Sequence, residues 1–155
     1  MQYVKTKTIL SSYTDNDRWF GYNYNMNLYR GCSHGCIYCD SRSDCYHVDN
    51  FDTVRAKENA LSILEQQLLK NPKKGIIGVG AMSDSYNPFE KTEKLTRGAL
   101  QIIDTYRFGI GLSTKSDLAV RDIDIFSCIK KHSPAMMKFT ITCADDELSQ
   151  KIEPF

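Results

Sequence analysis

A short apolar run occupies residues 75–82, where the chain reads Gly-Ile-Ile-Gly-Val-Gly-Ala-Met. Apolar residues without polar alternation are typical of a β-strand whose two faces are both covered. Such strands occur in parallel sheets, because the helices that connect parallel strands pack on the faces of the sheet. The run therefore favours an α/β fold.

Helical patterns lie on both sides of this strand. Residues 54–70 carry leucines at helical spacing, with Asp52 or Thr53 as the expected N-cap and Asn71-Pro72 as the expected stop. The other expected elements are strands at 22–28, 108–113 and 137–143, helices at 90–106 and 118–131, and a last helix capped by Asp145.

This alternation of strands and helices predicts a parallel sheet with right-handed crossovers, either in a barrel or in a doubly wound sheet. Ser83, Lys115 and Thr142 lie at or just beyond the C-terminal ends of expected strands. In a curved parallel sheet these ends converge on one mouth, which is where βα barrels hold their active sites. About four strands are expected in this chain, in one domain.

Three of the six cysteines lie in one short loop, at Cys32, Cys36 and Cys39. Their spacing, with Gly31 and Gly35 for a tight backbone, lets three thiolates point at a cubane iron–sulfur cluster. No fourth cysteine follows at matching spacing, so one iron of a 4Fe-4S cluster would stay open. An open iron is the arrangement of a catalytic centre rather than of an electron carrier.

Zinc is the alternative ligand for this loop. Cys36 and Cys39 could form a tetrahedral zinc site with Cys45 and His47, or with Cys32 and His34. Colour separates the two readings, since a cluster is brown and a zinc site is colourless.

Composition is that of a globular enzyme domain. The 155 residues are 41% hydrophobic and 25% charged, which is enough to bury a core. A net charge of +1 gives no electrostatic footprint for nucleic acid. The N-terminus has no apolar signal region and no stretch is long enough to cross a membrane, so a cytoplasmic location with reduced cysteines is expected.

The loop pattern, with Tyr38 as the aromatic residue before the third cysteine, resembles the signature of the radical S-adenosyl-L-methionine (SAM) superfamily. Further blocks resemble its spore photoproduct lyase-like branch, and they follow that family's order along the chain. These blocks are residues 27–32, 36–39, 83–90, 95–97, 113–116, 121–124 and 153–154.

The resemblance implies a lyase-like enzyme that reductively cleaves SAM to a 5′-deoxyadenosyl radical, using a 4Fe-4S cluster on Cys32, Cys36 and Cys39. It implies a one-electron reductant of the flavodoxin or ferredoxin type. It also implies a partial parallel (βα) barrel, of which residues 1–155 are a truncated N-terminal portion, with 1–21 as an extension and 22–155 as βα units. A second chain or self-association could complete the barrel. The alternative is a non-catalytic truncated domain that binds only a cluster or zinc.

Candidate SAM ligands follow from the same resemblance. Ser83 and Lys115 match positions that hold SAM, and a lysine suits the carboxylate of SAM as a cation. Thr140 or Thr142 matches a polar position used similarly, and Tyr38 is expected near the adenine. Without the resemblance, these residues have simpler interpretations as turn, solvated or packing residues.

The substrate is left open by the sequence. Asp84, Tyr86, Glu90 and Arg121 lie in the family-like blocks and are candidates to face it. DNA-repairing members resemble the chain at Ser83 but carry a hydrogen-donating cysteine where this chain has Ala81, so repair of DNA photoproducts is not expected. Two further expectations are that Cys128 lies in the core and that His34 is a loop residue.

Overall fold

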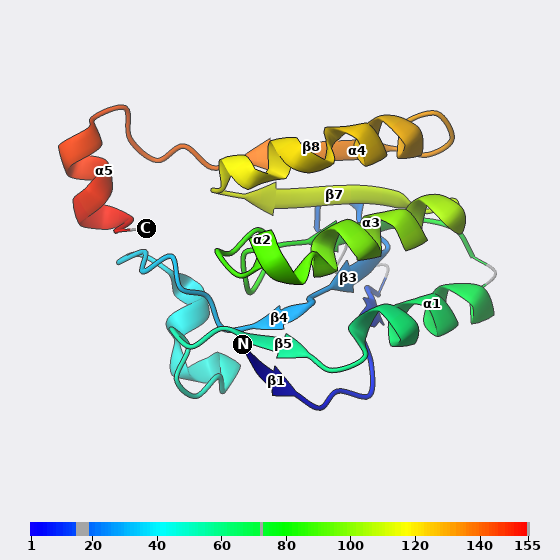
Figure 1. Ribbon diagram of the computed structural model, residues 1–155, viewed down its shortest axis with the longest axis horizontal. Coiled ribbons are helices and arrows are strands. Elements are labelled where there is room, and N and C mark those ends of the chain that lie inside the picture. The colour runs from blue at the N-terminus through cyan, green and yellow to red at the C-terminus, as the bar shows by residue number, and fades with distance from the viewer. Residues whose placement is uncertain (15–18, 72, 155) are drawn as a thin grey trace.

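The computed structural model describes residues 1–14, 19–71 and 73–154, so the expected helix stop at Pro72 lies outside the described residues. The chain forms a mixed α/β structure with two sheets (Figure 1). The larger sheet has the order β2-β3-β6-β7-β8, and the smaller has the order β1-β5-β4.

The larger sheet contains the parallel strands that the sequence predicts. Strands β3, β6, β7 and β8 pair in parallel, while β2 adds an antiparallel edge. The described residues form no closed barrel, because β2 and β8 are the two edges of this sheet. Its strands are β2 (Leu10–Ser12), β3 (Tyr24–Met26), β6 (Ile76–Val79), β7 (Gly109–Thr114) and β8 (Ala135–Phe139).

The smaller sheet joins the N-terminus to the segment that follows the cysteine loop. Strand β5 pairs in parallel with β1 and antiparallel with β4. Residues 1–21, expected as an extension, thus contribute a strand to each sheet. The three strands are β1 (Gln2–Val4), β4 (Tyr29–Arg30) and β5 (Arg55–Lys57).

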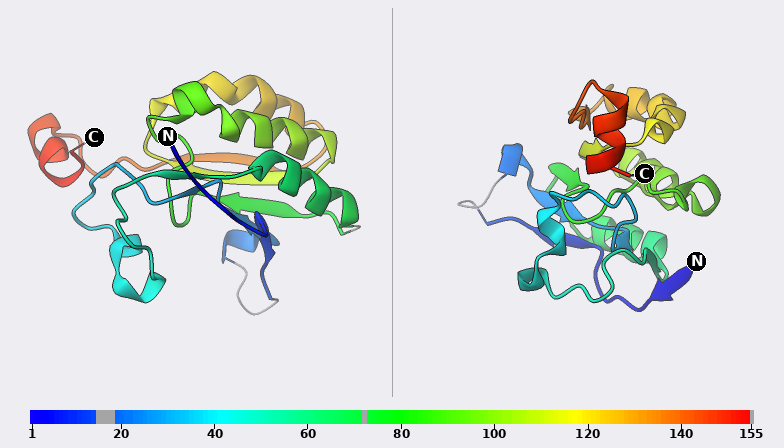
Figure 2. Two further views of the ribbon diagram at one scale, coloured as in Figure 1. Left: turned by 60° about the horizontal axis from the view of Figure 1, so that its bottom comes forward. Right: turned by 90° about the vertical axis from the view of Figure 1, so that its left-hand side faces the viewer.

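Helices α1, α3 and α4 lie side by side over one face of the larger sheet (Figures 1 and 2). The core between them is fully apolar, with Leu64 and Leu68 of α1 and Ile103 of α3 buried against Ile77 and Ile110 of the sheet. The helices are α1 (Ala60–Lys70), α2 (Glu90–Glu93), α3 (Leu95–Thr105), α4 (Ile123–Ile129) and α5 (Asp146–Ile152). Short 3-10 turns are η1 (Trp19–Gly21), η2 (Asp40–Arg42), η3 (Asp44–Tyr46) and η4 (Asp117–Asp122).

The expected helix over 54–70 is wrong in its first turn. Residues 55–57 form β5 instead, because β1 and β4 offer backbone partners on both sides. The helix begins only at Ala60, after Asn59 in the left-handed region (φ 53°), so neither Asp52 nor Thr53 is its N-cap. Backbone pairing with distant strands has overridden local helix propensity here.

Other boundaries also differ from the prediction. Lys94 has a φ of 52° and divides the helix expected at 90–106 into α2 and α3. The helix expected at 118–131 begins as η4 and becomes α-helical only at Ile123. The strand expected at 137–143 ends at Phe139, so Thr140 and Thr142 lie in the connection to α5. The strand expected at 22–28 is shorter in the structure, where β3 covers Tyr24–Met26 and β4 begins only at Tyr29.

No helix among the described residues is long and apolar enough to span a membrane.

Candidate functional site

The three loop cysteines lie on the wall of one cavity, together with the segments that follow β6 and β7. The cavity has a volume of about 140 Å³. Its lining includes Cys32, Cys36 and Cys39, residues 80–84 after β6, residues 113–115 at the end of β7, and Thr140 beyond β8. The prediction that the strand ends meet at the cysteine loop is therefore confirmed for Ser83 and Lys115, whereas Thr142 does not line this cavity.

Two glycines allow this close approach. Gly31 has a φ of 81°, and a Cβ there would come within 2.5 Å of the Phe51 carbonyl oxygen. Gly80 has a φ of 95°, and a Cβ there would come within 2.3 Å of the Ser113 carbonyl oxygen. Only glycine fits both the backbone conformation and the space, so the loops after β4 and β6 could not lie this near their neighbours with any side chain at these positions.

Ser83 fixes the start of the cysteine loop. Its buried hydroxyl donates to the Gly31 carbonyl oxygen at 2.7 Å, and the Cys32 backbone N–H donates to the Phe51 carbonyl oxygen at 2.8 Å. Ser83 also lines the cavity. Ser83, which is predicted as a SAM ligand, therefore ties the cysteine loop to the segment that follows β6.

His34 connects the first cysteine to a buried carboxylate. The Sγ of Cys32 lies 3.3 Å from Nδ1 of His34, and Nε2 of His34 lies 3.8 Å from Oδ2 of Asp84. Only 8% of His34 is exposed. The expectation that His34 is a loop residue is confirmed, and its ring lies between Cys32 and Asp84 and lines the cavity.

Asp84 is itself held by three donors. Its Oδ1 accepts from the hydroxyl of Thr114 at 2.7 Å and from the backbone N–H of Tyr86 at 2.9 Å. Its Oδ2 accepts from the backbone N–H of Lys115 at 2.9 Å. The carboxylate thus ties the loop after β6 to the end of β7, with one edge directed at His34.

The surroundings alter the acidity of these groups. Burial alone would raise the pKa of Cys32, but hydrogen bonding by the His34 ring and by the backbone of Asp84 and His34 leaves it below its ordinary value. The same hydrogen bond with Cys32, aided by the charge of Asp84, raises the pKa of His34. Burial raises the pKa of Cys36, and the charge of Lys115 opposes that rise. The environment therefore favours a thiolate at Cys32, the form that binds metal.

A second polar group lies beside the cavity, around the carboxylate of Glu153. Lys115 donates from Nζ to Oε1 of Glu153 at 2.5 Å, and Thr142 donates its hydroxyl to the same oxygen at 2.5 Å. The hydroxyl of Tyr38 also donates to Glu153, and the Lys115 Nζ lies 5.1 Å from the Tyr38 ring centroid. Ile37 anchors the end of α5 through a backbone hydrogen bond to Ile152, at 3.0 Å.

The predicted SAM residues are thus divided between two places. Ser83, Lys115 and Thr140 line the cavity, whereas Tyr38 and Thr142 gather around Glu153 at its side. Lys115 belongs to both groups. Glu153 was part of a recognised block without an assigned role, and no local pattern placed it near Lys115, since 37 residues lie between them in the chain.

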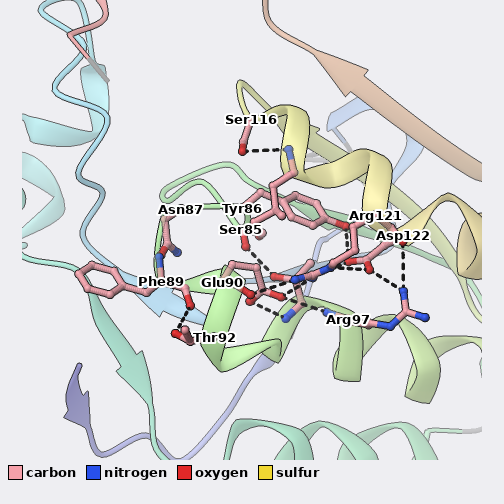
Figure 3. A network of polar contacts seen from close by, with 12 residues as sticks. Ser85, Tyr86, Asn87, Phe89, Glu90, Thr92, Arg97, Ser116, Arg121 and Asp122 are labelled. Atoms are coloured by element: carbon pink, nitrogen blue, oxygen red, sulfur yellow. Dashed lines mark hydrogen bonds and ion pairs between the residues drawn. The ribbon is translucent and has the colours of Figure 1, made fainter.

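Tyr86, Glu90 and Arg121 have structural partners and do not line the cavity of the three cysteines, although Tyr86 lines a neighbouring cavity with His34 and Lys115. Arg121 pairs with Glu90 at 2.8 Å and with Asp122 at 2.7 Å, and the Tyr86 hydroxyl donates to Asp122 at 3.0 Å (Figure 3). Glu90 and Asp122 are fully buried. The sequence placed these residues as candidates to face the substrate, and the structure places them in a network that ties α2 to η4.

Three thiols, those of Cys32, Cys36 and Cys39, are the soft donors on the wall of the cavity. Among the described residues, no three His, Cys, Asp or Glu side chains come together as ligands of a single metal ion. Cluster thiolates each bind a different iron, so three cysteines spread over one cavity wall fit such a group. Cys45 and His47, which complete one zinc alternative, are exposed and do not line the cavity. Cys128 is also exposed, so its expected place in the core is wrong.

Comparison with known proteins finds relatives for most of the chain. It is 38% identical over 138 residues to the uncharacterized protein MJ0683 of Methanocaldococcus jannaschii, a match over 87% of this chain and 50% of that protein. It is 27% identical over 139 residues to the uncharacterized protein Rv2578c of Mycobacterium tuberculosis, a match over 85% of this chain and 41% of that protein. No family model matches the chain, and no solved structure matches it. The chain therefore spans half the length, or less, of these relatives.

Proposed function

We propose that this chain is part of a cytoplasmic radical SAM enzyme of the spore photoproduct lyase-like branch, with a 4Fe-4S cluster on Cys32, Cys36 and Cys39. The observation that carries this proposal is that all three thiols line one cavity with the segments that follow β6 and β7. All six cysteines are free thiols, which agrees with a metal-binding loop in a reducing compartment. The strands β3, β6, β7 and β8 would be the first part of a partial barrel.

The cofactors would supply the reactive chemistry: with SAM bound, one electron from the reduced cluster breaks the bond between sulfur and C5′, which gives methionine and a 5′-deoxyadenosyl radical. The electron would come from a flavodoxin or ferredoxin type reductant. The residues of this chain would bind and orient the two cofactors.

Lys115 is the residue best placed to bind the carboxylate of SAM. It lines the cavity, and its Nζ already holds a carboxylate, that of Glu153. Tyr38 and Thr142 donate to that same carboxylate. Two hydroxyls and an ammonium around one carboxylate form a set of donors that suits the carboxylate of SAM equally well.

Ser83 and Asp84 would keep these groups in position. Ser83 fixes the loop through Gly31, and Asp84 accepts from the backbone of Lys115 and from the hydroxyl of Thr114. Rigid support of this kind matters, because binding groups lose much of their effect when they are misplaced.

Anaerobic reconstitution with iron and sulfide tests the proposal. Brown protein with a 4Fe-4S spectrum is expected, followed by 5′-deoxyadenosine when SAM and a reductant are added. Replacement of Cys32, Cys36 or Cys39 by Ala should abolish the cluster, whereas the exposed Cys128→Ala should not. Colourless protein with stoichiometric zinc would contradict the proposal.

The alternative is a domain that binds a cluster without catalysis. The chain spans 50% of its M. jannaschii relative, so a longer chain is the comparison to make. A stable cluster without formation of 5′-deoxyadenosine, together with activity in a chain that also spans the rest of that relative, would favour this alternative for residues 1–155.

A further inference from the structure

We propose that His34 is a positioning residue that sets the reduction potential of the cluster, through a hydrogen bond from its ring to the sulfur of Cys32. This inference rests on the proposed function. It concerns a residue for which neither the cysteine spacing nor the SAM-binding positions predict a role.

The geometry places a ring nitrogen of His34 beside the sulfur of Cys32. Its Nδ1 lies 3.3 Å from Sγ of Cys32, within the range of a hydrogen bond to sulfur. A metal-bound thiolate has no proton and can only accept, so Nδ1 must be the donor in the loaded protein. The ring is buried, which strengthens the interaction compared with one in water.

Asp84 faces the other nitrogen of the ring at ion-pair distance. Its Oδ2 lies 3.8 Å from Nε2 of His34, on the side of the ring opposite to Cys32. Asp84 cannot turn away freely, because Thr114, Tyr86 and the backbone of Lys115 hold its two oxygens. A histidine that binds through one nitrogen while a carboxylate faces the other is a recurrent way to orient an imidazole at a metal centre.

A donor at the ligand sulfur acts on the cluster through its charge. Reduction adds one negative charge to the cluster, and part of this charge lies on the cysteine sulfurs. The His34 N–H stabilises the reduced form more than the oxidised form, which raises the potential. Removal of the donor should therefore make the cluster harder to reduce.

Potentiometric titration of reconstituted protein tests this effect. His34→Phe keeps a ring of similar size but has no donor, so its potential should be lower than that of the wild type. His34→Gln retains an amide N–H, so its potential should lie closer to the wild-type value. His47→Gln is the matched control, since His47 is exposed and outside the cavity, and should leave the potential unchanged.

A spectroscopic measurement identifies the contact directly. Protein labelled with 15N-histidine should show a coupling between a histidine nitrogen and the reduced cluster, in pulsed electron paramagnetic resonance. The coupling should be lost in His34→Gln and kept in His47→Gln. This comparison also decides the case if His34→Phe does not retain a cluster.

The outcomes separate the two proposals. A wild-type cluster whose potential is unaffected by His34→Phe, or that shows no histidine coupling, overturns the role of His34 and leaves the radical SAM proposal standing. Absence of any cluster in the wild type overturns both.

Discussion

Lys115 contacts two features at once. It lines the cavity of the three cysteines, and it pairs with the carboxylate of Glu153. Its ammonium is 2.5 Å from Glu153 and 5.1 Å from the centre of the Tyr38 ring. Its backbone N–H is held by Asp84. Both the backbone and the ammonium of Lys115 are therefore held by carboxylates. A charged group that is held in place binds a ligand more effectively than a mobile one.

Replacement of Lys115 by Ala should weaken SAM binding to the reconstituted protein by about 1–3 kcal/mol, the usual range for a hydrogen bond to a charged group. The cluster absorbance should not change, because Lys115 is not a cluster ligand. Equilibrium dialysis with labelled SAM measures the affinity, with the exposed Lys130→Ala as control. An unchanged affinity in Lys115→Ala would remove this residue from the site.

Among the elements, α5 is a helix without buried residues. It lies apart from the layer of α1, α3 and α4 (Figures 1 and 2), and none of its residues is fully buried. Its C-terminal end meets the cysteine loop through Ile152 and Glu153. The pairing of Glu153 with Lys115 thus joins the end of α5 to the segment that follows β7.

Glu153→Gln should release Lys115, because a neutral amide binds an ammonium less strongly than a carboxylate does. The expected results are faster acylation of Lys115 by an N-hydroxysuccinimide ester, measured by mass spectrometry, and tighter binding of SAM, since the two carboxylates share the same donors. Glu147→Gln, on the exposed first turn of α5, is the control. If Glu153→Gln binds SAM more weakly, Glu153 contributes to the SAM site rather than competing with it.

In the whole molecule, a network of two buried carboxylates, Glu90 and Asp122, and two partly exposed arginines, Arg97 and Arg121, joins α2, α3 and η4 (Figure 3). Asp122 accepts from both arginines, and no part of its side chain is exposed. Burial alone would raise the pKa of Asp122, but hydrogen bonds from Arg121, Arg97 and Tyr86 hold it below its ordinary value. The carboxylate is therefore charged in the folded state and is stabilised by its partners.

Asp122→Asn should lower the free energy of unfolding by about 1–3 kcal/mol, because Arg97, Arg121 and Tyr86 lose hydrogen bonds to a buried, charged carboxylate. Urea denaturation followed by circular dichroism measures the loss. Asp124→Asn is a suitable control, since Asp124 pairs with the same Arg97 but its side chain is 61% exposed. If the two variants lower the free energy of unfolding by equally small amounts, the network does not stabilise the fold.

Acid should remove the contribution of Asp122. Its pKa is lower in the folded chain than the ordinary value of 3.8, so the stabilisation is present above that value and is lost as the pH falls through the native pKa. The difference in stability between the wild type and Asp122→Asn should therefore be constant near neutral pH and narrow below about pH 4. A difference that widens on acidification would contradict this assignment.

The edge of the larger sheet should favour association. Among the described residues, β8 pairs only with β7, and Phe139 and Ile141 near its end are exposed. Unpaired strand edges with apolar side chains bind further strands. We expect residues 1–155 to form oligomers or aggregates in light scattering, and Ile141→Lys to reduce this. A monodisperse monomer that cleaves SAM by itself would show that the edge needs no partner.

The sequence by itself determined the local features that depend on neighbouring residues. The strands at 75–82 and 108–113 appear as β6 and β7, because an apolar run with both faces covered has few other solutions. The cap at Asp145 is confirmed by its hydrogen bond from the Leu148 backbone at 2.8 Å. The meeting of the cysteine loop with Ser83 and Lys115 also followed from sequence, since parallel strands end at one edge.

Only the tertiary structure decided the features that depend on distant partners. Residues 55–57 became a strand because β1 and β4 bind them on both sides. His34 acquired its place from Asp84, 50 residues away, and Lys115 met Glu153 because the end of α5 lies against the cysteine loop. Local sequence does not predict such contacts. They depend on how the elements pack, and that packing depends on the whole sheet.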